Sequence, residues 1–241
     1  MLSGKLFRRS LQRSLRAPQP PRRYAVTRNE SESVAQSLQQ DDGSSCWKCD
    51  HVSSSCSFFC RKCDAIQPLS KRCNYFEMFN IPKNFKLEPR SIEKTYWNLL
   101  KRLHPDLYGS KSEFEQELSA ANAAVVNDAY KILKTANTRV KYLLSLDGID
   151  ALGETASTAV NPELLMEMMG IRERIATAAN VDVLHDIREE LLNRIDDVIK
   201  KLDEVYDKDQ DLEAAKGYAV ELQYTVKCVE EIDLREEKLD G

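Results

Sequence analysis

The sequence lacks several features that mark well-known structural classes. Its 241 residues include only eight glycines and eight prolines, too few for a collagen-like or low-complexity chain. No uncharged apolar run approaches the ~18 residues of a membrane span, so we expect a soluble mature protein without a membrane partner. No Gly-rich loop is present to cradle phosphate groups. The net charge of −4 gives no sign of bulk nucleic-acid binding.

Acidic residues are absent from the first 29 positions. This stretch carries eight of the 35 basic residues and none of the 39 acidic ones, so its charge is +8 and that of the remaining chain is −12. An N-terminus rich in Arg and Ser, without an apolar h-region, is typical of an organellar transit peptide rather than a secretory signal. We predict that residues 1–36 are a mitochondrial transit peptide or a disordered segment, removed from the mature protein. The alternative is a basic arm that binds nucleic acid.

Five of the seven cysteines lie between positions 46 and 63. They include two C-x2-C pairs, Cys46 with Cys49 and Cys60 with Cys63. Two such turns can place four thiolates at the corners of a tetrahedron, which suits Zn²⁺. We therefore predict a zinc-binding module over residues 41–70. One structural ion would supply the folding energy that its few apolar side chains cannot.

Other uses of these cysteines stay open. A site of four sulfur ligands can also hold iron. Redox-active C-x2-C pairs would need a supporting βαβ context, and none is visible. Disulfides are disfavoured where the compartment keeps thiols reduced. We expect Cys56 to be a loop residue, and Cys73 and Cys228 to be small buried hydrophobic side chains.

From position 73 onward the apolar residues recur at helical spacing. A short helix is predicted to end near Pro82, a second to run from Pro89 to His104, and a third to begin beyond a loop through Gly109. The predicted apolar stripe of the second helix is Ile92, Tyr96, Leu99 and Leu103, and that of the third is Phe114, Leu118, Ala121, Val125, Ala129 and Ile132.

The tripeptide His104-Pro105-Asp106 opens the loop between the second and third helices. Pro105 disfavours helical geometry at His104. Residues 81–104 carry six basic and two acidic side chains, and so a local charge of +4. A basic helix can steer onto an acidic partner surface.

Two antiparallel helices around this loop, within residues 73–146, resemble the J domain of DnaJ-type co-chaperones. The resemblance implies docking onto a DnaK-type ATPase chaperone and stimulation of its ATP hydrolysis. It assigns the contacts to His104, Pro105, Asp106, Lys94, Lys101 and Arg102.

Residues 147–160 indicate a linker, because Gly, Ser, Thr and Asp dominate them. Asn161 and Pro162 then suit the cap and first residue of a helix. Three amphipathic helices are predicted beyond them, and an antiparallel three-helix bundle over residues 161–241 would bury all their stripes. These stripes are Leu164, Met168, Ile171 and Ile175; Leu184, Ile187, Leu191, Val198, Leu202 and Val205; and Leu212, Ala215, Ala219, Leu222, Val226 and Val229.

The order of these parts resembles the HscB family of iron–sulfur cluster co-chaperones over residues 46–241. The resemblance rests on the HPD loop, the stretch RVKYLLSLDGID and the bundle that begins NPELLMEMMGIRERI. The four-cysteine module resembles that of the mitochondrial animal members. Leu143, Leu144 and Leu146, in the family's YLLSL stretch, are expected to seat the J domain against the bundle.

The resemblance implies a non-enzymatic adaptor in the mitochondrial matrix, with the cytoplasm open as a second location. Its bundle would bind the scaffold on which clusters are assembled and promote cluster transfer to recipient proteins. Gly170 departs from the family pattern, which often has an acidic residue there. The residues that carry over as scaffold-binding are Leu165, Met166, Met169, Glu173 and Tyr224.

Two other classes of function remain as alternatives. A zinc-dependent nucleic-acid-binding protein would use the cysteine module and the basic arm, although the acidic mature chain argues against nucleic acid as a partner. A thiol oxidoreductase would use the C-x2-C pairs. The sequence leaves open whether the zinc module forms a homodimer.

Overall fold

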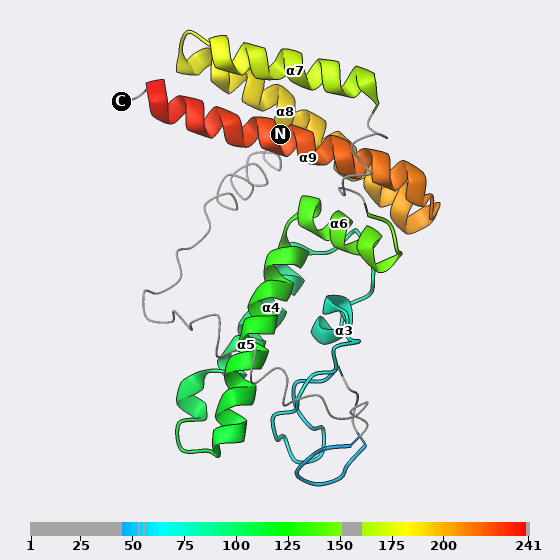
Figure 1. Cartoon of the computed structure of the whole chain (residues 1–241), viewed down its shortest axis with the longest axis vertical. Helices are drawn as coiled ribbons and strands as arrows, with labels where there is room; N and C mark the ends of the chain where they lie inside the picture. Colours follow the sequence, from blue (N-terminus) through cyan, green and yellow to red (C-terminus); the bar gives the residue numbers. More distant parts are fainter. Residues whose placement is uncertain (1–44, 53, 55, 151–160, 240–241) are drawn as a thin grey trace. The chain divides into compact units, whose positions relative to one another are not determined.

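The computed structural model describes residues 45–52, 54, 56–150 and 161–239 (Figure 1). The predicted transit peptide, residues 1–36, and residues 151–160 of the predicted linker lie outside this described part. The described chain is mainly helical, as the sequence predicts. Its only β-structure is two isolated bridges, Ser45 with Val52 and Phe59 with Ile66.

Four helices follow the cysteine-rich segment: α3 (Tyr75–Phe79), α4 (Pro89–Arg102), α5 (Glu113–Lys134) and α6 (Ala136–Leu146). Their ends are set by local hydrogen bonds. Asn74 caps α3, and Ser112 caps α5 in a capping box with Glu115. Glu88 gives α4 no side-chain cap, but Pro89 occupies its first turn, where a missing N–H costs nothing.

The buried face of α5 includes Leu118 and Ala129, as predicted, but at three other positions it lies one residue beyond the predicted stripe. Val126 and Leu133 are buried, whereas the predicted Val125 and Ile132 are only half-buried. The observed face passes through buried Asn122, which is polar. A search for apolar residues at helical spacing therefore selected the neighbouring row.

The short helix α6 supplies a buried anchor to the rest of the chain. Leu143 and Leu144 are fully buried and α6 packs against α9 (Leu212–Leu239), but Leu146 is 38% exposed. The expectation that Leu146 seats one unit on the other is thus wrong. Leu146 is the last residue of its helix, and the packing around α6 ends there.

Polar contacts also join this region to the C-terminal helices. The carboxylate of Asp207 accepts the backbone N–H groups of Phe85 (2.7 Å) and Lys86 (2.8 Å). The Tyr206 hydroxyl donates to Asp147 at 2.6 Å. Both Tyr206 and Asp207 belong to a π-helical turn, η3 (Asp203–Lys208), in which Tyr206 is buried where the sequence predicted Val205.

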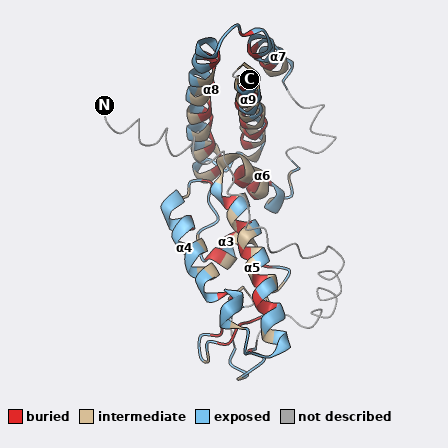
Figure 2. Ribbon diagram, turned by 90° about the vertical axis from the view of Figure 1, so that its left-hand side faces the viewer, coloured by how far each residue is buried: buried red, intermediate tan, exposed pale blue. Residues whose placement is uncertain are grey.

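The C-terminal helices are α7 (Pro162–Thr177), α8 (Val181–Leu202) and α9, with η3 between the last two. Figure 2 shows buried positions along α8 and α9 where these helices face each other. Most of the predicted stripe residues are buried. The exceptions on α9 are Leu212 and Val226, which are half-buried, while the polar Thr225 and the thiol of Cys228 take core positions instead.

Cys56 and Cys73 form a disulfide, which corrects two expectations. Cys56 does lie in a loop and Cys73 is buried, as expected, but neither was expected to be paired, and Cys73 was expected within a helix. Cys73 instead lies just before the Asn74 cap of α3, and its Cα is 5.5 Å from that of Cys56. Residues 17 positions apart meet here only through tertiary folding, which no spacing rule reveals. Cys228 is free and buried, as expected.

Candidate metal centre and binding surfaces

The four-cysteine module, residues 45–67, is built from two similar halves. In each half the first cysteine accepts a backbone hydrogen bond from the aspartate that follows the second cysteine: Asp50 to Cys46, and Asp64 to Cys60, both 2.9 Å. Asp50 and Asp64 both adopt left-handed backbone conformations, with φ of 54° and 57°. Each half is closed by one isolated bridge.

A repeated sequence signal accounts for this pairing. Both halves read C-x-K-C-D, and aspartate is among the few residues that tolerate the left-handed conformation. The C-x2-C spacing alone predicted the four ligands but not the turn that directs them. The repeated aspartate marks this turn.

The four thiols meet as predicted. The Sγ atoms of Cys46 and Cys63 are 3.6 Å apart, those of Cys49 and Cys60 are 3.7 Å apart, and all four lie within 4.8 Å of one another. A tetrahedral ion with Zn–S bonds of about 2.3 Å requires sulfur–sulfur distances of about 3.8 Å. The cluster therefore fits one tetrahedral ion, and its sulfur ligands suit zinc or iron.

Backbone donors prepare two of these thiols for a metal. Burial raises the pKa of the Cys46 thiol, but hydrogen bonds from the backbone N–H groups of Lys48 and Cys49 and from the thiols of Cys63 and Cys49 together lower it by more, to about 6. The backbone N–H groups of Cys63 and Lys62 lower the pKa of Cys60, against the effect of burial. Such donors favour the thiolate, the form that binds metal.

The module rests against the end of α4 and the start of α5. The guanidinium of Arg102 lies 3.6 Å over the ring of Phe59 and forms an ion pair with Asp64. Trp47 meets Phe114 edge to face, with ring centroids 5.3 Å apart. Arg102 was predicted as a chaperone contact, and it is already engaged by the module.

The loop that joins α4 to α5 exposes His104-Pro105-Asp106. His104 has an extended backbone (φ −64°, ψ 131°), as the following proline predicts, and Pro105–Leu107 forms a single 3-10 turn. The Nδ1 atom of His104 accepts the backbone N–H of Asp106 at 3.3 Å. The side chains of His104 and Asp106 are 58% and 85% exposed, so a partner can reach both.

The predicted basic residues line the outer side of α4. Lys94 and Lys101 are exposed, and Trp97 lies between them in sequence with 51% of its surface exposed. Positions 94, 97 and 101 fall on one helix face. The sequence prediction omitted Trp97, although its position between two lysines at helical spacing was the available signal.

The second predicted surface lies on α7. Met166 and Met169 are 74% and 70% exposed, Glu173 is exposed one turn further on, and Leu165 is half-buried. These residues share one side of the helix. Tyr224, predicted for the same surface, is half-buried on α9, a helix that packs against α7.

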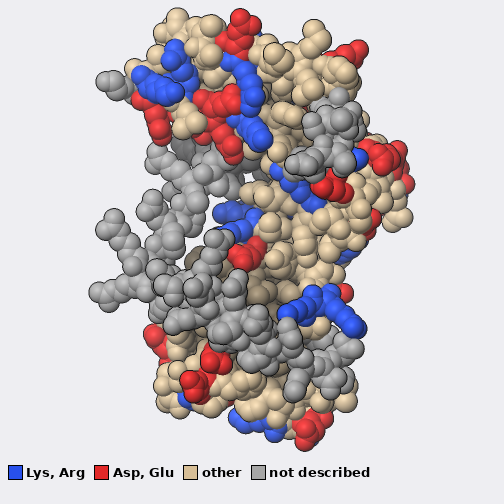
Figure 3. Space-filling view, in the orientation of Figure 1, with Lys and Arg blue, Asp and Glu red and all other residues tan. Residues whose placement is uncertain are grey.

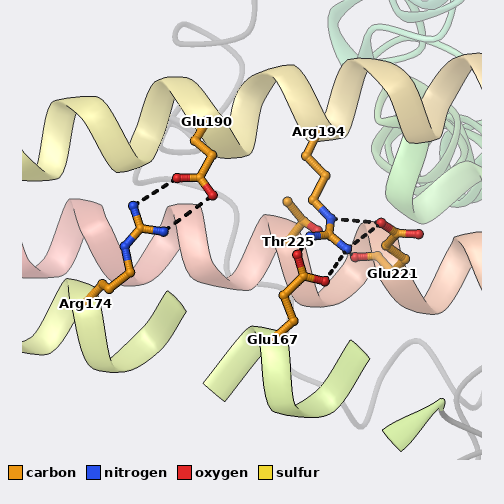
Figure 4. A network of polar contacts seen from close by, with 6 residues as sticks. All are labelled: Glu167, Arg174, Glu190, Arg194, Glu221 and Thr225. Carbon is orange, nitrogen blue, oxygen red and sulfur yellow. Dashed lines mark hydrogen bonds and ion pairs between the residues drawn. The ribbon is translucent and has the colours of Figure 1, made fainter. Parts of the chain in front are cut away.

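Charged residues tie α7 to its neighbours behind this surface. Figure 4 shows Arg194 of α8 between Glu167 of α7 and Glu221 of α9. Its Nη2 is 2.9 Å from Glu167 Oε2, and its Nε is 2.8 Å from Glu221 Oε1. Hydrogen bonding from Arg194 lowers the pKa of Glu167. Basic and acidic side chains are interspersed over these helices (Figure 3).

Arg174 of α7 forms a second ion pair, with Glu190 of α8; its Nη2 lies 2.9 Å from Glu190 Oε2. Glu167 directly follows Met166 in sequence, so the ion pairs hold the helix that carries the exposed methionines. None of the described helices combines the length and the apolar character needed to cross a membrane.

Two protein families match the chain. Residues 74–142 match the DnaJ domain, and residues 160–233 match the HSCB C-terminal oligomerisation domain. The first match contains the loop at His104, and the second contains the exposed face of α7.

Individual relatives match well over half of this chain. An iron–sulfur cluster co-chaperone protein HscB homolog of Arabidopsis thaliana is 33% identical over 155 residues, which is 64% of this chain and 60% of that protein. HscB of Mus musculus is 30% identical and covers 78% of this chain and 81% of its own length. A co-chaperone HscB homolog of Aliivibrio fischeri (strain MJ11) is 33% identical, covering 70% and 99%.

The solved structures that resemble this chain include members of the same family. The crystal structure of the human co-chaperone protein HscB superposes with a TM-score of 0.72 at 26% identity, covering 81% of this chain and 100% of that one. The chaperone HscB from Vibrio cholerae gives a TM-score of 0.61 at 29% identity, covering 69% and 99%.

Proposed function

Because this chain belongs to the HscB family of iron–sulfur cluster co-chaperones, we propose that it links a DnaK-type ATPase chaperone to the scaffold protein on which clusters are assembled. The J domain would stimulate the chaperone's ATPase while the C-terminal helices hold the scaffold. Hydrolysis would then lock the chaperone on the scaffold and promote transfer of the cluster to recipient proteins. The energy comes from the partner's ATP.

The exposed His104-Pro105-Asp106 turn is the observation that carries this proposal. It projects from the end of a basic helix in an otherwise acidic chain, with His104 and Asp106 open to a partner. The lysines of α4 would steer this end onto an acidic chaperone surface. Asp106 can pair with an arginine, and His104 can contribute one free ring nitrogen, since its Nδ1 is occupied by its own backbone.

The scaffold would dock on α7 through Leu165, Met166, Met169 and Glu173, with Tyr224 from α9. Flexible, polarizable methionine side chains suit an adaptable protein interface, and two neighbouring exposed methionines are unusual on a surface without a partner. The proposed antiparallel three-helix topology is supported by connections as short as residues 178–180 between α7 and α8, which leave the chain room only to turn back.

The remaining assignments follow from the same proposal. Cys46, Cys49, Cys60 and Cys63 would hold one structural zinc ion, which would supply cross-linking rather than reactive chemistry. Residues 1–36 would direct the protein to the mitochondrial matrix. The zinc module would span residues 41–70, the J domain residues 73–146 and the C-terminal bundle residues 161–241. The linker 147–160 would join the J domain to the bundle. Sedimentation of the mature chain would decide between a monomer and a homodimer.

The test is an ATPase assay with the DnaK-type chaperone, with and without the scaffold. We expect His104→Gln to abolish stimulation and leave scaffold affinity unchanged. We expect Met166→Ala with Met169→Ala to weaken scaffold binding while the basal stimulation without scaffold persists. Stimulation by the His104→Gln protein would reject the docking loop, and unchanged scaffold affinity in the methionine variant would reject the α7 surface.

A further inference from the structure

The docking loop, residues 103–112, has each of its ends held by a different half of the four-cysteine module. At the first end, Arg102 stacks over Phe59 and pairs with Asp64, both of which flank the Cys60–Cys63 pair. At the other end, Phe114 packs on Trp47, which lies between Cys46 and Cys49. The module therefore spans the loop from one helix to the other.

A metal ion would join these two halves into one body. Each close sulfur pair crosses between them: Cys46 with Cys63 at 3.6 Å, and Cys49 with Cys60 at 3.7 Å. The buried apolar side chains beside the thiols, Phe58, Phe59, Ala65 and Ile66, all belong to the second half, so no apolar core spans both halves. One hydrogen bond also joins the halves, from Trp47 Nε1 to the carbonyl of Ile66 at 2.7 Å. Without the ion the two sulfur contacts would be lost, and this partly exposed bond would be left to hold Trp47 near Phe59, and hence the two ends of the loop together.

Buried polar contacts give the module a second connection to the loop. Gln67 is 5% exposed, and its Nε2 donates to Cys46 Sγ at 3.3 Å. The backbone carbonyl oxygen of Gln67 accepts a hydrogen bond from the side-chain amide of buried Asn122 on α5, at 3.0 Å. One turn before Asn122, Ser119 donates to the carbonyl of Leu103, directly before His104, at 2.7 Å. Contacts of this kind are costly to leave unmade.

We infer that the four-cysteine module is a brace for the docking loop, in which bound metal sets the geometry that His104-Pro105-Asp106 presents to the chaperone. Phe59 and Trp47 are positioning residues in this scheme, acting through Arg102 and Phe114. The inference rests on the proposed chaperone-docking function. It makes the metal site a determinant of docking rather than an independent unit that only covers the N-terminal side of the J domain.

The decisive variant is Phe59→Leu combined with Phe114→Leu in the mature chain. Leucine keeps apolar volume at both positions but removes the ring under Arg102 and the edge-to-face pair with Trp47. We expect an unchanged metal content and an unchanged scaffold affinity. Amide hydrogen exchange in residues 103–112 should accelerate about fivefold, and the co-chaperone concentration for half-maximal ATPase stimulation should rise about fivefold, as expected for the loss of weak aromatic contacts.

A matched pair of aspartate variants tests the smaller contact. Asp64→Asn and Asp50→Asn change equivalent left-handed turn positions of the two halves, where asparagine is tolerated. Only Asp64 pairs with Arg102. Because this pair is exposed, we expect Asp64→Asn to accelerate loop exchange about twofold, and Asp50→Asn to leave it unchanged.

Removal of the metal with a chelator provides the third measurement. Exchange in residues 103–112 should then accelerate further than in the double variant, while exchange in α8 and α9 stays as it was. Loop exchange that is the same in the wild type, the double variant and the metal-free protein would overturn the brace. A wild-type protein that fails to stimulate the chaperone would instead reject the proposed function, since the exchange measurements need no partner.

Discussion

The four-cysteine module and the C-terminal helices α7–α9 hold their shapes by different means. The module has few buried apolar side chains, and its two halves meet through the four thiols, buried Gln67 and the hydrogen bond from Trp47 to Ile66. The C-terminal helices bury continuous stripes and add ion pairs across their edges. Loss of the metal site should therefore unfold the whole module. Truncation of one core side chain should instead remove only part of the folding free energy of the helices.

The largest expected effect separates the two regions. Cys60→Ser removes one of the four thiolate ligands and should abolish metal binding. The effect on the module should be large, because structural zinc sites contribute about 10 kcal/mol or more to folding. Elemental analysis should find no bound metal, and exchange of residues 45–67 should become fast while α8 and α9 keep their protection. His51→Ala, at an exposed module position, is the control and should retain the ion. Full metal content in Cys60→Ser would contradict the four-thiol site.

A core truncation should give the opposite pattern. Leu191 on α8 is 1% exposed, and Leu191→Ala should cost about 2 to 5 kcal/mol through lost burial and the cavity left behind. Denaturant unfolding followed by circular dichroism would measure it, with metal content unchanged. Val183→Ala on the same helix, at a 41% exposed position, should change stability little. Equal losses in both variants would show that α8 is not packed as described.

The ion pairs of the C-terminal helices predict a smaller loss. Arg194→Ala leaves Glu221, whose side chain is 19% exposed, without this partner, and should cost about 1 to 3 kcal/mol. The folded-state pKa of Glu167 is lowered, so its contribution is present above the ordinary glutamate pKa and is lost as the pH falls through the folded value. Denaturant unfolding at neutral and at acidic pH would measure this. The difference in the free energy of unfolding between wild type and variant should be smaller at acidic pH.

The smallest expected effect is a gain in stability. A Cβ added at Gly170 on α7 would meet nothing within 4 Å, and the same holds for Gly217 on α9. Alanine at either position should stabilise its helix by about 0.5 to 1 kcal/mol. Thermal unfolding would measure both. Gly170 adjoins the proposed scaffold face, so only Gly170→Ala should alter scaffold affinity; an effect of Gly217→Ala on that affinity would place the face elsewhere.

Much of the fold followed from local pattern. The helix starts at Pro89 and Pro162 and the loop that opens at His104 were predicted, because capping, proline geometry and helical spacing act over a few residues. Helical spacing did not decide whether Met166 and Met169 are exposed or packed. The cluster of four cysteines followed from two short turns. The errors arose where polar side chains entered the core, as Asn122 did on α5, or where a helix ended, as at Leu146.

The sequence by itself determined most of the helices, the set of four thiols and the turn that presents His104, since each follows from a local pattern: helical spacing, two C-x2-C turns and the geometry of a residue before proline. It did not predict α6 as a separate helix. Tertiary structure alone decided that Cys56 meets Cys73, that Arg102 faces the module, and that Phe114 packs on Trp47. These contacts join side chains from separate elements. Their geometry depends on how the elements pack, and spacing along the chain carries no record of that packing.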